Sequence, residues 1–327
     1  MGVVSRVLVT GGAGFIGSHY VRTLVAGGYP AWAGAAVTVL DKLTYSGNMD
    51  NLAPAEGGFR FVHGDICDTE LLAEVVPGHD VVINFAAETH VDRSIASSGA
   101  FARTNVMGAH RLALACLDAD VPQFVQVSTD EVYGSVAEGS WREDAPVSPN
   151  SPYAAAKAGG DLLALACART HGLDVRVTRC GNNYGPYQFP EKVIPLFVTR
   201  LLERRRVPLY GDGMNTRDWI HVDDHCRGIQ LVAERGAAGE TYHISGDTEL
   251  TNLSLTERLL HALGLGPEMI EWVADRKGHD RRYSLNGDRL RALGFRPMTD
   301  FDEGLEATIR WYVDNPGWWK PLLAHPR

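Results

Sequence analysis

Two short stretches hold the side chains with the clearest capacity for proton transfer. Residues 128–134 read Ser-Thr-Asp-Glu-Val-Tyr-Gly, and residues 151–157 read Ser-Pro-Tyr-Ala-Ala-Ala-Lys. Hydroxyls, two carboxyl groups, a phenol and an amine are thus available to one site. Neighbouring carboxyl groups such as Asp130 and Glu131 share one proton readily, so one can act as an acid and the other as a base. Which residue takes which role stays open at this stage, because such a pair titrates as a coupled unit.

Tyr153 and Lys157 form the second half of this set. They are four residues apart, which places them on one face of a helix. A nearby ammonium stabilises a phenolate, so we expect Lys157 to lower the pKa of Tyr153 from its ordinary value of about 10. The tyrosine would then be a base for the proton of a substrate alcohol.

The elements that must position these residues follow an α/β pattern. Short apolar runs alternate with helix-period segments, which predicts a doubly wound parallel sheet covered by helices on both faces. The run before the acid pair ends directly at Ser128, and parallel sheets bind ligands beyond the carboxyl ends of their strands. The candidate strands are residues 7–10, 37–40, 59–62, 81–85, 124–127 and 175–178, and the candidate helices are 16–25, 69–76, 100–117 and 153–171.

A glycine-rich turn near the N-terminus predicts a nucleotide cofactor. Residues 6–18 read Arg-Val-Leu-Val-Thr-Gly-Gly-Ala-Gly-Phe-Ile-Gly-Ser, which is an apolar strand, a G-x-x-G-x-x-G turn and the start of an apolar helix. Glycines let the backbone approach a pyrophosphate and direct helix N-terminal amides toward it. The predicted fold class is therefore α/β and Rossmann-like. The expected cofactor contacts in this turn are Gly11, Gly14, Phe15, Ile16 and Gly17.

The ends of the next strands favour NAD as the cofactor. Asp41 can accept hydrogen bonds from ribose hydroxyls and would repel the 2'-phosphate of NADP, although the adjacent Lys42 weakens the argument. Asp65 is expected to reach the adenine amino group, with a helix cap as the alternative. Such a pocket would let Tyr153 deprotonate an alcohol while a hydride passes to the nicotinamide. The remaining expected cofactor contacts are Lys42, Thr44, Ile66, Ala86, Ala87, Tyr153 and Lys157.

After Cys180 the chain changes to loops, short strands and helices. We expect an NAD-binding domain over residues 1–181, to which segments near 215–240 return, and a smaller substrate-binding α/β lobe over 182–327. A strand around Ile220 and His221 is expected to rejoin the large sheet. Residues 221–225 read His-Val-Asp-Asp-His, where we expect Asp223 and Asp224 to cap a helix and no metal to bind. The expected elements of the lobe are helices near 193–204, 255–263 and 301–313 and strands near 209–210 and 242–244.

The bulk composition narrows the partners and the compartment. A formal net charge of -9 and a pI near 5.7 argue against a nucleic acid or an anionic membrane as partner. No apolar run reaches the roughly 18 residues of a membrane span. The five scattered cysteines lack CxxC spacing, which indicates reduced thiols. We therefore expect a cytoplasmic protein.

The two longest predicted helices, 100–117 and 153–171, are apolar on more than one face, as at Leu112, Ala115, Leu162 and Leu163. Helices of this kind are covered on all sides. A second copy of the chain could cover them, giving a homodimer, and packing within one chain is the alternative.

With these motifs assembled, the chain resembles the extended short-chain dehydrogenases/reductases over its whole length, and among them the dTDP-glucose 4,6-dehydratases. The motifs that carry the resemblance are Thr-Gly-Gly-Ala-Gly-Phe-Ile-Gly, Asp-Lys-Leu-Thr-Tyr, Ser-Thr-Asp-Glu-Val-Tyr-Gly, Ser-Pro-Tyr-x-x-x-Lys and Asn-Asn-Tyr-Gly-Pro-Tyr-Gln. The family implies NAD and the sugar nucleotide dTDP-glucose as ligands. It also implies a redox-neutral loss of water that yields dTDP-4-keto-6-deoxyglucose.

The resemblance also assigns roles to the catalytic side chains. Tyr153 would take the 4-hydroxyl proton as NAD takes the C4 hydride, and Thr129 would hold the resulting ketone. Glu131 would remove the C5 proton, Asp130 would protonate the departing C6 hydroxyl, and the hydride would return to C6. The implied substrate contacts are His90, Ser94, Thr129, Asn182, Lys192, Pro208, Tyr210, Arg217, Asn252, Arg276, His279 and Tyr283.

Three related enzyme classes compete with this interpretation. UDP-glucuronate decarboxylases and GDP-mannose dehydratases resemble Ser-Thr-Ser-Glu where this chain has Ser-Thr-Asp-Glu, and epimerases lack the acid pair. Asp130 thus separates the classes, because an acid for a leaving hydroxyl serves no purpose in a decarboxylase. A nucleotide-binding scaffold without catalysis is a further alternative, but it would be expected to have lost Tyr153, Lys157 or the acid pair.

Overall fold

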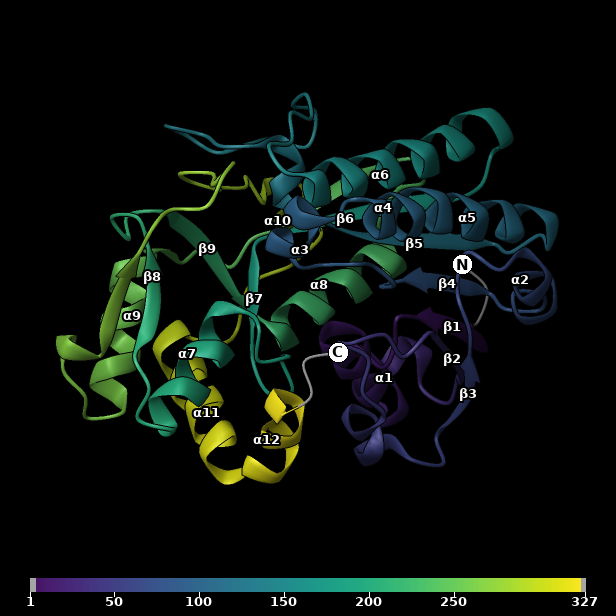
Figure 1. Cartoon of the computed structure of the whole chain (residues 1–327). Helices are drawn as coiled ribbons and strands as arrows, with labels where there is room; N and C mark the ends of the chain where they lie inside the picture. The colour runs from purple at the N-terminus through teal and green to yellow at the C-terminus, as the bar shows by residue number, and fades with distance from the viewer. Residues whose placement is uncertain (1–3, 325–327) are drawn as a thin grey trace.

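The computed structural model describes residues 4–324, which form two lobes (Figure 1). The larger lobe is built on a seven-stranded sheet of order β10-β6-β5-β4-β1-β2-β3, in which neighbouring strands are parallel. The strand order reverses direction between β1 and β4, as in a doubly wound fold. The predicted fold class is confirmed. The strands are β1 Arg6–Thr10, β2 Ala36–Asp41, β3 Phe59–His63, β4 Val81–Asn84, β5 Gln123–Thr129, β6 Val175–Cys180 and β10 Thr241–Ile244.

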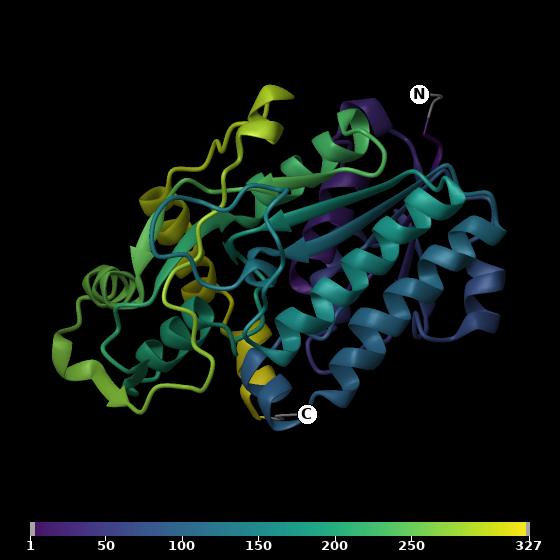
Figure 2. The same cartoon turned by 90° about the horizontal axis from the view of Figure 1, so that it is seen from above.

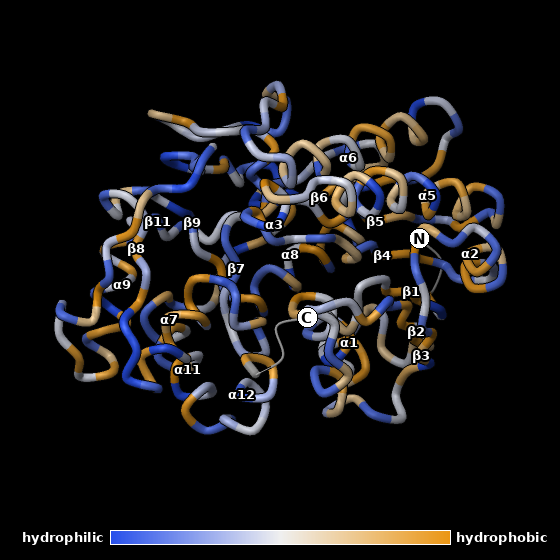
Figure 3. The backbone as a smooth tube through the Cα atoms, in the orientation of Figure 1, coloured by the Kyte–Doolittle hydropathy of each residue, from blue (hydrophilic) through white to orange (hydrophobic). Residues whose placement is uncertain are grey.

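Helices cover both faces of this sheet (Figures 1 and 2). Side chains alternate between the faces of a strand, so on β1 Val7 and Val9 pack with the core under α1 and α8, whereas Leu8 packs with the core under α2, α5 and α6. Strands β1 and β4 are accordingly apolar over most of their length and are mostly orange in Figure 3. The helices are α1 Phe15–Val25 and α8 Val222–Arg235 on one face, and α2 Thr69–Val75, α5 Ala109–Asp118 and α6 Pro152–His171 on the other.

The helix predicted over 100–117 is interrupted. The chain forms α4 (Gly99–Phe101), then the π-helical turn η4 (Ala102–Gly108), and only then α5. The neighbouring helix α6 passes very close here, since a Cβ atom on Gly160 would lie 2.2 Å from the Asn105 carbonyl oxygen. The Asn105 side chain also bonds the backbone of Glu88 in both directions, each at 2.9 Å, so the turn supports the loop that follows β4.

The smaller lobe has its own core, which includes Phe197, Leu209, Leu259 and Leu305. It holds a three-stranded sheet of order β11-β9-β7 and a two-stranded sheet, β12-β8. The strands are β7 Asn182–Tyr184, β8 Val207–Tyr210, β9 Thr216–His221, β11 Glu249–Thr251 and β12 Ile270–Val273, and the helices are α7 Val193–Leu202, α9 Asn252–Ala262, α11 Phe301–Asp314 and α12 Pro316–Ala324. Short elements complete the chain: η1 Pro30–Trp32, η2 Met49–Asn51, η3 Ala53–Ala55, α3 Val91–Ala96, η5 Asp130–Tyr133, η6 Pro267–Met269 and α10 Asp288–Ala292.

Three predictions about the second half were wrong. The strand that contains Ile220 and His221 is β9, which pairs with β7 and β11 and not with the large sheet. The run expected in the lobe at 242–244 is β10, which pairs with β6 at the edge of the large sheet. The cap of α8 is His221, whose Nδ1 accepts from the Asp223 amide, whereas Asp224 accepts from the amides of Met298 and Thr299. Short apolar runs do not specify which strands they pair with. The division into two domains near residue 181 stays a prediction.

Two further predictions concern the chain as a whole. All five cysteines are buried and free of disulfides. Within residues 4–324, no helix is both long and apolar enough to cross a membrane.

Candidate active site

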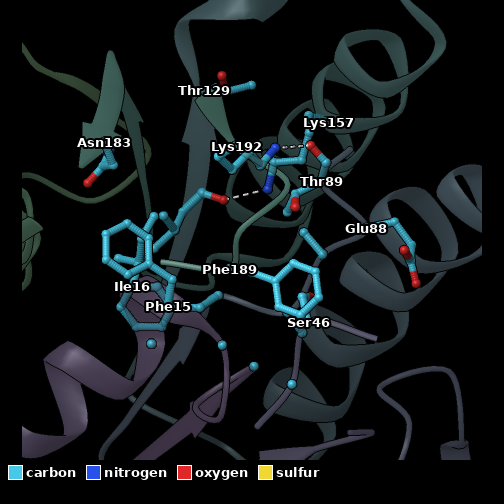
Figure 4. Close-up of a pocket in the computed structure, with 18 of the residues that line it drawn as sticks. Phe15, Ile16, Ser46, Glu88, Thr89, Thr129, Lys157, Asn183, Phe189 and Lys192 are labelled. Atoms are coloured by element: carbon cyan, nitrogen blue, oxygen red, sulfur yellow. Dashed lines mark hydrogen bonds between the residues drawn. The ribbon is translucent and has the colours of Figure 1, made fainter. Parts of the chain in front are cut away.

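A pocket opens at the carboxyl ends of the large sheet and extends to the smaller lobe (Figure 4). The end of β5 and the start of α6 meet the glycine turn here, so the two stretches with proton-transfer chemistry share one cavity with the nucleotide turn. Each predicted cofactor contact lines it, namely Gly11, Gly14, Phe15, Ile16, Gly17, Asp41, Lys42, Thr44, Asp65, Ile66, Ala86 and Ala87, as do Thr129, Asp130, Glu131, Tyr153 and Lys157.

The glycine turn forms a cradle that side chains would fill. Gly11 has a φ of 68°, and a Cβ atom there would lie 2.5 Å from the Ala86 backbone nitrogen. A Cβ atom on Gly17 would lie 2.3 Å from the Gly11 carbonyl oxygen. Helix α1 begins after Gly14 without a side-chain cap, so the amides of its first turn remain available to an anion. The turn therefore fits the pyrophosphate of a dinucleotide.

Asp41 and Lys42 lie at the end of β2 as predicted. The Asp41 carboxylate accepts from the amides of Ala13 and Leu43 at 2.9 and 2.7 Å, which fixes it beside the glycine turn. The Lys42 ammonium lies 2.9 Å from Asp65 Oδ2, so its charge is paired. This pairing removes the reservation about Lys42 and strengthens the preference for NAD over NADP. Asp65 does not cap α2, because the cap is Asp68.

The acid pair lies on the turn η5, which starts as β5 ends. The Thr129 hydroxyl accepts from the Glu131 amide at 3.3 Å and donates to Asp130 Oδ1 at 3.2 Å. Asp130 is 3% exposed, and its Oδ2 is buried without a hydrogen bond to any residue that the structure describes. One carboxyl oxygen of Asp130 is therefore left for a ligand in the pocket.

The surroundings separate the two carboxyl groups. Burial raises the pKa of Asp130 well above its ordinary value, and the negative charge of Glu131 raises it further. Burial also raises the pKa of Glu131, but the positive charges of Arg276, Lys192 and Arg217 oppose that rise. When the two carboxyl groups share one proton, these surroundings favour the proton on Asp130 and the negative charge on Glu131.

Tyr153 and Lys157 lie on the first turns of α6 and are both buried. Lys157 Nζ donates to the Val127 carbonyl oxygen at 2.6 Å. The expected lowering of the Tyr153 pKa was wrong for the protein alone, because burial raises this pKa well above its ordinary value and Glu131 adds to the rise. A side-chain hydrogen bond with Thr129 opposes the rise, and the positive ring of an oxidised nicotinamide would act in the same direction as Thr129.

Two of the implied substrate contacts from the second half, Asn182 and Lys192, line the pocket. Lys192 Nζ donates to the Thr89 carbonyl oxygen at 2.7 Å, across the boundary between the lobes (Figure 4). The His90 side chain caps α3, and its Nε2 lies 3.8 Å from Glu191 Oε2. Ser94 is fully buried and accepts from the Tyr153 amide at 3.2 Å, so its hydroxyl supports α6 rather than facing the pocket.

The other implied contacts lie outside the lining of this pocket, in the smaller lobe and the loop after β12. Arg217 donates to the Asp280 carbonyl oxygen and stacks on the Tyr283 ring, whose centroid lies 4.3 Å from the guanidinium carbon. Arg276 Nη1 lies 3.9 Å from Asp92 Oδ1. The rings of Tyr210 and His279 meet edge to face. Pro208 lies on β8, and Asn252 begins α9.

Sequence reasoning missed two residues at the mouth of the pocket. Glu191 and Phe189 line it, and the Tyr45 hydroxyl donates to Glu191 Oε1 at 2.9 Å while its ring meets that of Phe189. The signal was present, since Glu191 directly precedes Lys192 and Tyr45 ends the motif Asp-Lys-Leu-Thr-Tyr. Nothing in the spacing showed that these two distant segments meet.

Comparison with known proteins adds to this geometry. A family model described as GDP-mannose 4,6 dehydratase matches residues 8–308. A dTDP-glucose 4,6-dehydratase from Streptomyces niveus is 59% identical over 98% of this chain and 96% of its own. The chain belongs to the dTDP-glucose 4,6-dehydratase family. A crystal structure of the dTDP-glucose 4,6-dehydratase from Streptomyces venezuelae with NAD bound is 60% identical and covers 97% of this chain and 99% of its own, with a TM-score of 0.96.

A structure of UDP-glucose 4-epimerase from Thermotoga maritima is also similar, with a TM-score of 0.88 at 31% identity over 95% of this chain and 99% of its own. The fold is therefore shared between dehydratases and epimerases. Because both enzymes share this fold, the activity depends on the side chains that the pocket carries.

Proposed function

We propose that this protein is a hydro-lyase that converts dTDP-glucose to dTDP-4-keto-6-deoxyglucose with NAD as its cofactor. The observation that carries the proposal is the placement of Asp130 and Glu131 on η5, in one pocket with Tyr153, Lys157 and the glycine turn. Bound NAD supplies the hydride acceptor at C4 and the hydride donor at C6, so the cycle needs no second redox partner.

The side chains divide the proton transfers among them. Tyr153 takes the proton of the 4-hydroxyl, with Lys157 held beside it, and the Thr129 hydroxyl bonds the new ketone. The ketone acidifies C5, where Glu131 removes a proton. Asp130 gives its proton to the C6 hydroxyl, which leaves as water, and the proton held by Glu131 returns to C5 when the hydride is added at C6. These roles are supported by the opposed surroundings of the acid pair, in which burial and the charge of Glu131 favour the protonated form of Asp130, whereas three cations favour the ionised form of Glu131.

Cationic side chains support a diphosphate ligand beside this pair. Lys192, Arg217 and Arg276 act together on Glu131, and Arg276 Nε is buried without a hydrogen bond to the described residues. Guanidinium groups suit phosphate oxygens because they offer forked donors. His90, Asn182, Pro208, Tyr210, Asn252, His279 and Tyr283 would complete the contacts with the sugar and the base, and the structure leaves Ser94 a supporting role behind them.

The proposal extends to assembly and location. Met107, Leu114 and Leu162 are exposed apolar side chains on the adjacent segments η4, α5 and α6, which supports a homodimer formed through this face. The five free cysteines support a cytoplasmic location, where thiols stay reduced. The division into an NAD-binding domain and a sugar-nucleotide lobe near residue 181 is also part of the proposal.

The test uses dTDP-glucose that carries deuterium at C4, with no NAD added. We expect a 4-keto product with the deuterium at C6, seen by NMR and mass spectrometry, and no net accumulation of reduced cofactor. Loss of the label to solvent would refute internal hydride return. Turnover of UDP-glucuronate, with none of dTDP-glucose, would identify a decarboxylase, and C4 inversion without water loss an epimerase. A protein that binds NAD but converts none of these substrates would be a scaffold.

A further inference from the structure

A buried polar chain lies behind η5 and takes no part in the proton transfers described above. It joins Asp161 on α6, Arg179 on β6, Tyr133 on η5 and His243 on β10, and all four side chains are buried. Arg179 Nε donates to Asp161 Oδ2 at 3.1 Å, and Arg179 Nη1 donates to the Tyr133 hydroxyl oxygen at 2.6 Å. That oxygen lies 2.7 Å from His243 Nε2.

The direction of each hydrogen bond in this polar chain follows from the partner of His243. His243 Nδ1 lies 3.0 Å from the Asn286 carbonyl oxygen, which can only accept, so Nδ1 carries the proton. Burial lowers the pKa of His243 to about 3, which keeps the ring neutral and leaves Nε2 as an acceptor. The Tyr133 hydroxyl therefore accepts from Arg179 and donates to His243 at 2.7 Å, with the Glu143 carbonyl oxygen as a second and more distant acceptor at 3.4 Å. Both of its hydrogen-bonding functions are used, which holds the tyrosine in one position.

Two members of this polar chain, Tyr133 and Asp161, lie on the two elements that carry the active-site residues. Tyr133 is the last residue of η5, the turn that carries Asp130 and Glu131. Asp161 is one helical turn beyond Lys157, so it lies on the same face of α6, and its carboxylate opposes the lowering of the Lys157 pKa by burial. Arg179 on β6 links Tyr133 to Asp161, and it lies at the position paired with Ser128 on β5.

We propose that Tyr133, Arg179 and Asp161 are positioning residues that hold the acid pair on η5 in register with Tyr153 and Lys157 on α6. The proposal rests on the proposed dehydration, in which a base on one element and an acid pair on another must act on neighbouring carbons of one sugar. A displacement of about 1 Å is enough to slow such chemistry by roughly a hundredfold.

The first test is Tyr133→Phe. This change removes only the hydroxyl and keeps the ring, which stacks on Trp141 at 6.0 Å. We expect kcat to fall about 10- to 100-fold with KM changed less than about twofold, because the turn shifts while substrate contacts remain. After rapid mixing with dTDP-glucose, the near-ultraviolet absorbance of reduced nicotinamide should build up. Tyr153 and Lys157 still support oxidation, whereas the displaced acid pair slows water loss.

The second test removes the ion pair behind the turn. A single change at Asp161 or Arg179 would leave one buried charge unpaired and is expected to impair folding. The double variant Asp161→Leu with Arg179→Met removes both charges together. We expect it to slow oxidation as well as water loss, because the hydrogen bonds that connect α6 to η5 are lost.

Tyr242→Phe is the matched control. It removes a buried hydroxyl from the residue next to His243 on β10. That hydroxyl accepts from the Ala237 amide at 2.8 Å and belongs to no hydrogen bond of the buried polar chain.

The outcomes separate positioning from general support of the fold. A selective loss of the elimination rate in Tyr133→Phe, with the control at wild-type rates, supports the proposal. Wild-type elimination in Tyr133→Phe overturns it, as does an equal fall of both steps accompanied by a lower melting temperature. Absence of turnover by the wild-type protein would overturn the proposed function, and this proposal with it.

Discussion

At the scale of single residues, Asp130 and Glu131 differ by what surrounds them and not by their chemistry. Asp130 is buried, and the charge with the largest effect on its pKa is the negative charge of Glu131. One of its carboxyl oxygens has no hydrogen-bond partner among the described residues. Glu131 is next to it in sequence but is acted on by three cations from the smaller lobe and its loops. Those cations are distant in sequence, so the residues themselves left the two roles open. The family resemblance proposed an assignment, and the surroundings of the two carboxyl groups in the fold give it a physical reason.

We predict that Asp130→Asn slows water loss about 10²- to 10⁴-fold, the range that a positioned general acid contributes. C4 oxidation should remain, so reduced nicotinamide should build up on the enzyme after mixing with dTDP-glucose. Because burial and the charge of Glu131 raise the pKa of Asp130, this group keeps its proton to a higher pH than an ordinary aspartate and loses it as the pH rises through the raised pKa. The elimination rate of the wild type should therefore fall as the pH rises through that pKa.

Asp144→Asn is the matched control, because this acid lies in the segment after η5 but is exposed. It should leave both steps unchanged. Loss of C4 oxidation itself in Asp130→Asn, with the fold intact, would show that Asp130 acts earlier than proposed.

At the scale of elements, the sequence predicted the alternation of strands and helices in the first half because each strand there is an apolar run followed by a helix-period segment. It did not predict η4, since this π-helical turn lies where α6 passes close to Asn105 at Gly160, a contact that the apolar pattern of residues 100–117 does not contain. It misplaced β10 because a four-residue strand carries no information about its neighbour. The mouth of the pocket, where Tyr45 meets Glu191, likewise depends on a contact between segments far apart in sequence.

The glycine turn was predictable in detail, and it yields a prediction at this scale. Gly17→Ala places a Cβ atom 2.3 Å from the Gly11 carbonyl oxygen, so α1 and the turn must move apart. We expect the Kd for NAD to rise at least about tenfold, which corresponds to about 1.4 kcal/mol. The measurement is the NAD content of the purified protein after denaturation, followed by titration of the stripped protein.

Gly99→Ala is the control, because nothing lies within 4 Å of a Cβ atom at that position and its backbone is helical. It should keep the NAD content of the wild type. Full NAD content in Gly17→Ala would mean that the turn tolerates separation from α1 and does not form the tight cradle described above.

At the scale of the whole molecule, contacts across the pocket join the two lobes. Lys192 reaches the Thr89 carbonyl oxygen, and at the far end of the chain Trp318 donates to the Asn51 side chain at 3.0 Å. Asn51 in turn donates to the carbonyl oxygen of Ala13 in the glycine turn at 2.9 Å. The C-terminal helix α12 thus supports the cofactor turn of the other lobe, and the pocket depends on both lobes keeping their places.

The outer face of α5 and α6 is the remaining feature at this scale. The sequence predicted helices covered on all sides, yet Leu162 on α6 is 51% exposed in the single chain. If a second copy covers this face, Leu162→Glu places a carboxylate in an apolar interface at a cost of several kcal/mol. We therefore predict that the wild type is a dimer and that this variant is a monomer at micromolar concentration, as measured by light scattering after size-exclusion chromatography.

The control for this prediction is Val313→Glu, which changes an apolar side chain of similar exposure, 48%, on α11 of the smaller lobe. It should leave the dimer intact, because the proposed interface lies on the other lobe. A monomeric wild type would show that the exposed face is not a subunit interface, and a Leu162→Glu variant that stays dimeric would place the interface elsewhere. Because the glycine turn and the other expected cofactor contacts of a single chain line one pocket, we expect a monomeric variant still to bind NAD, which separates assembly from cofactor binding in the same sample.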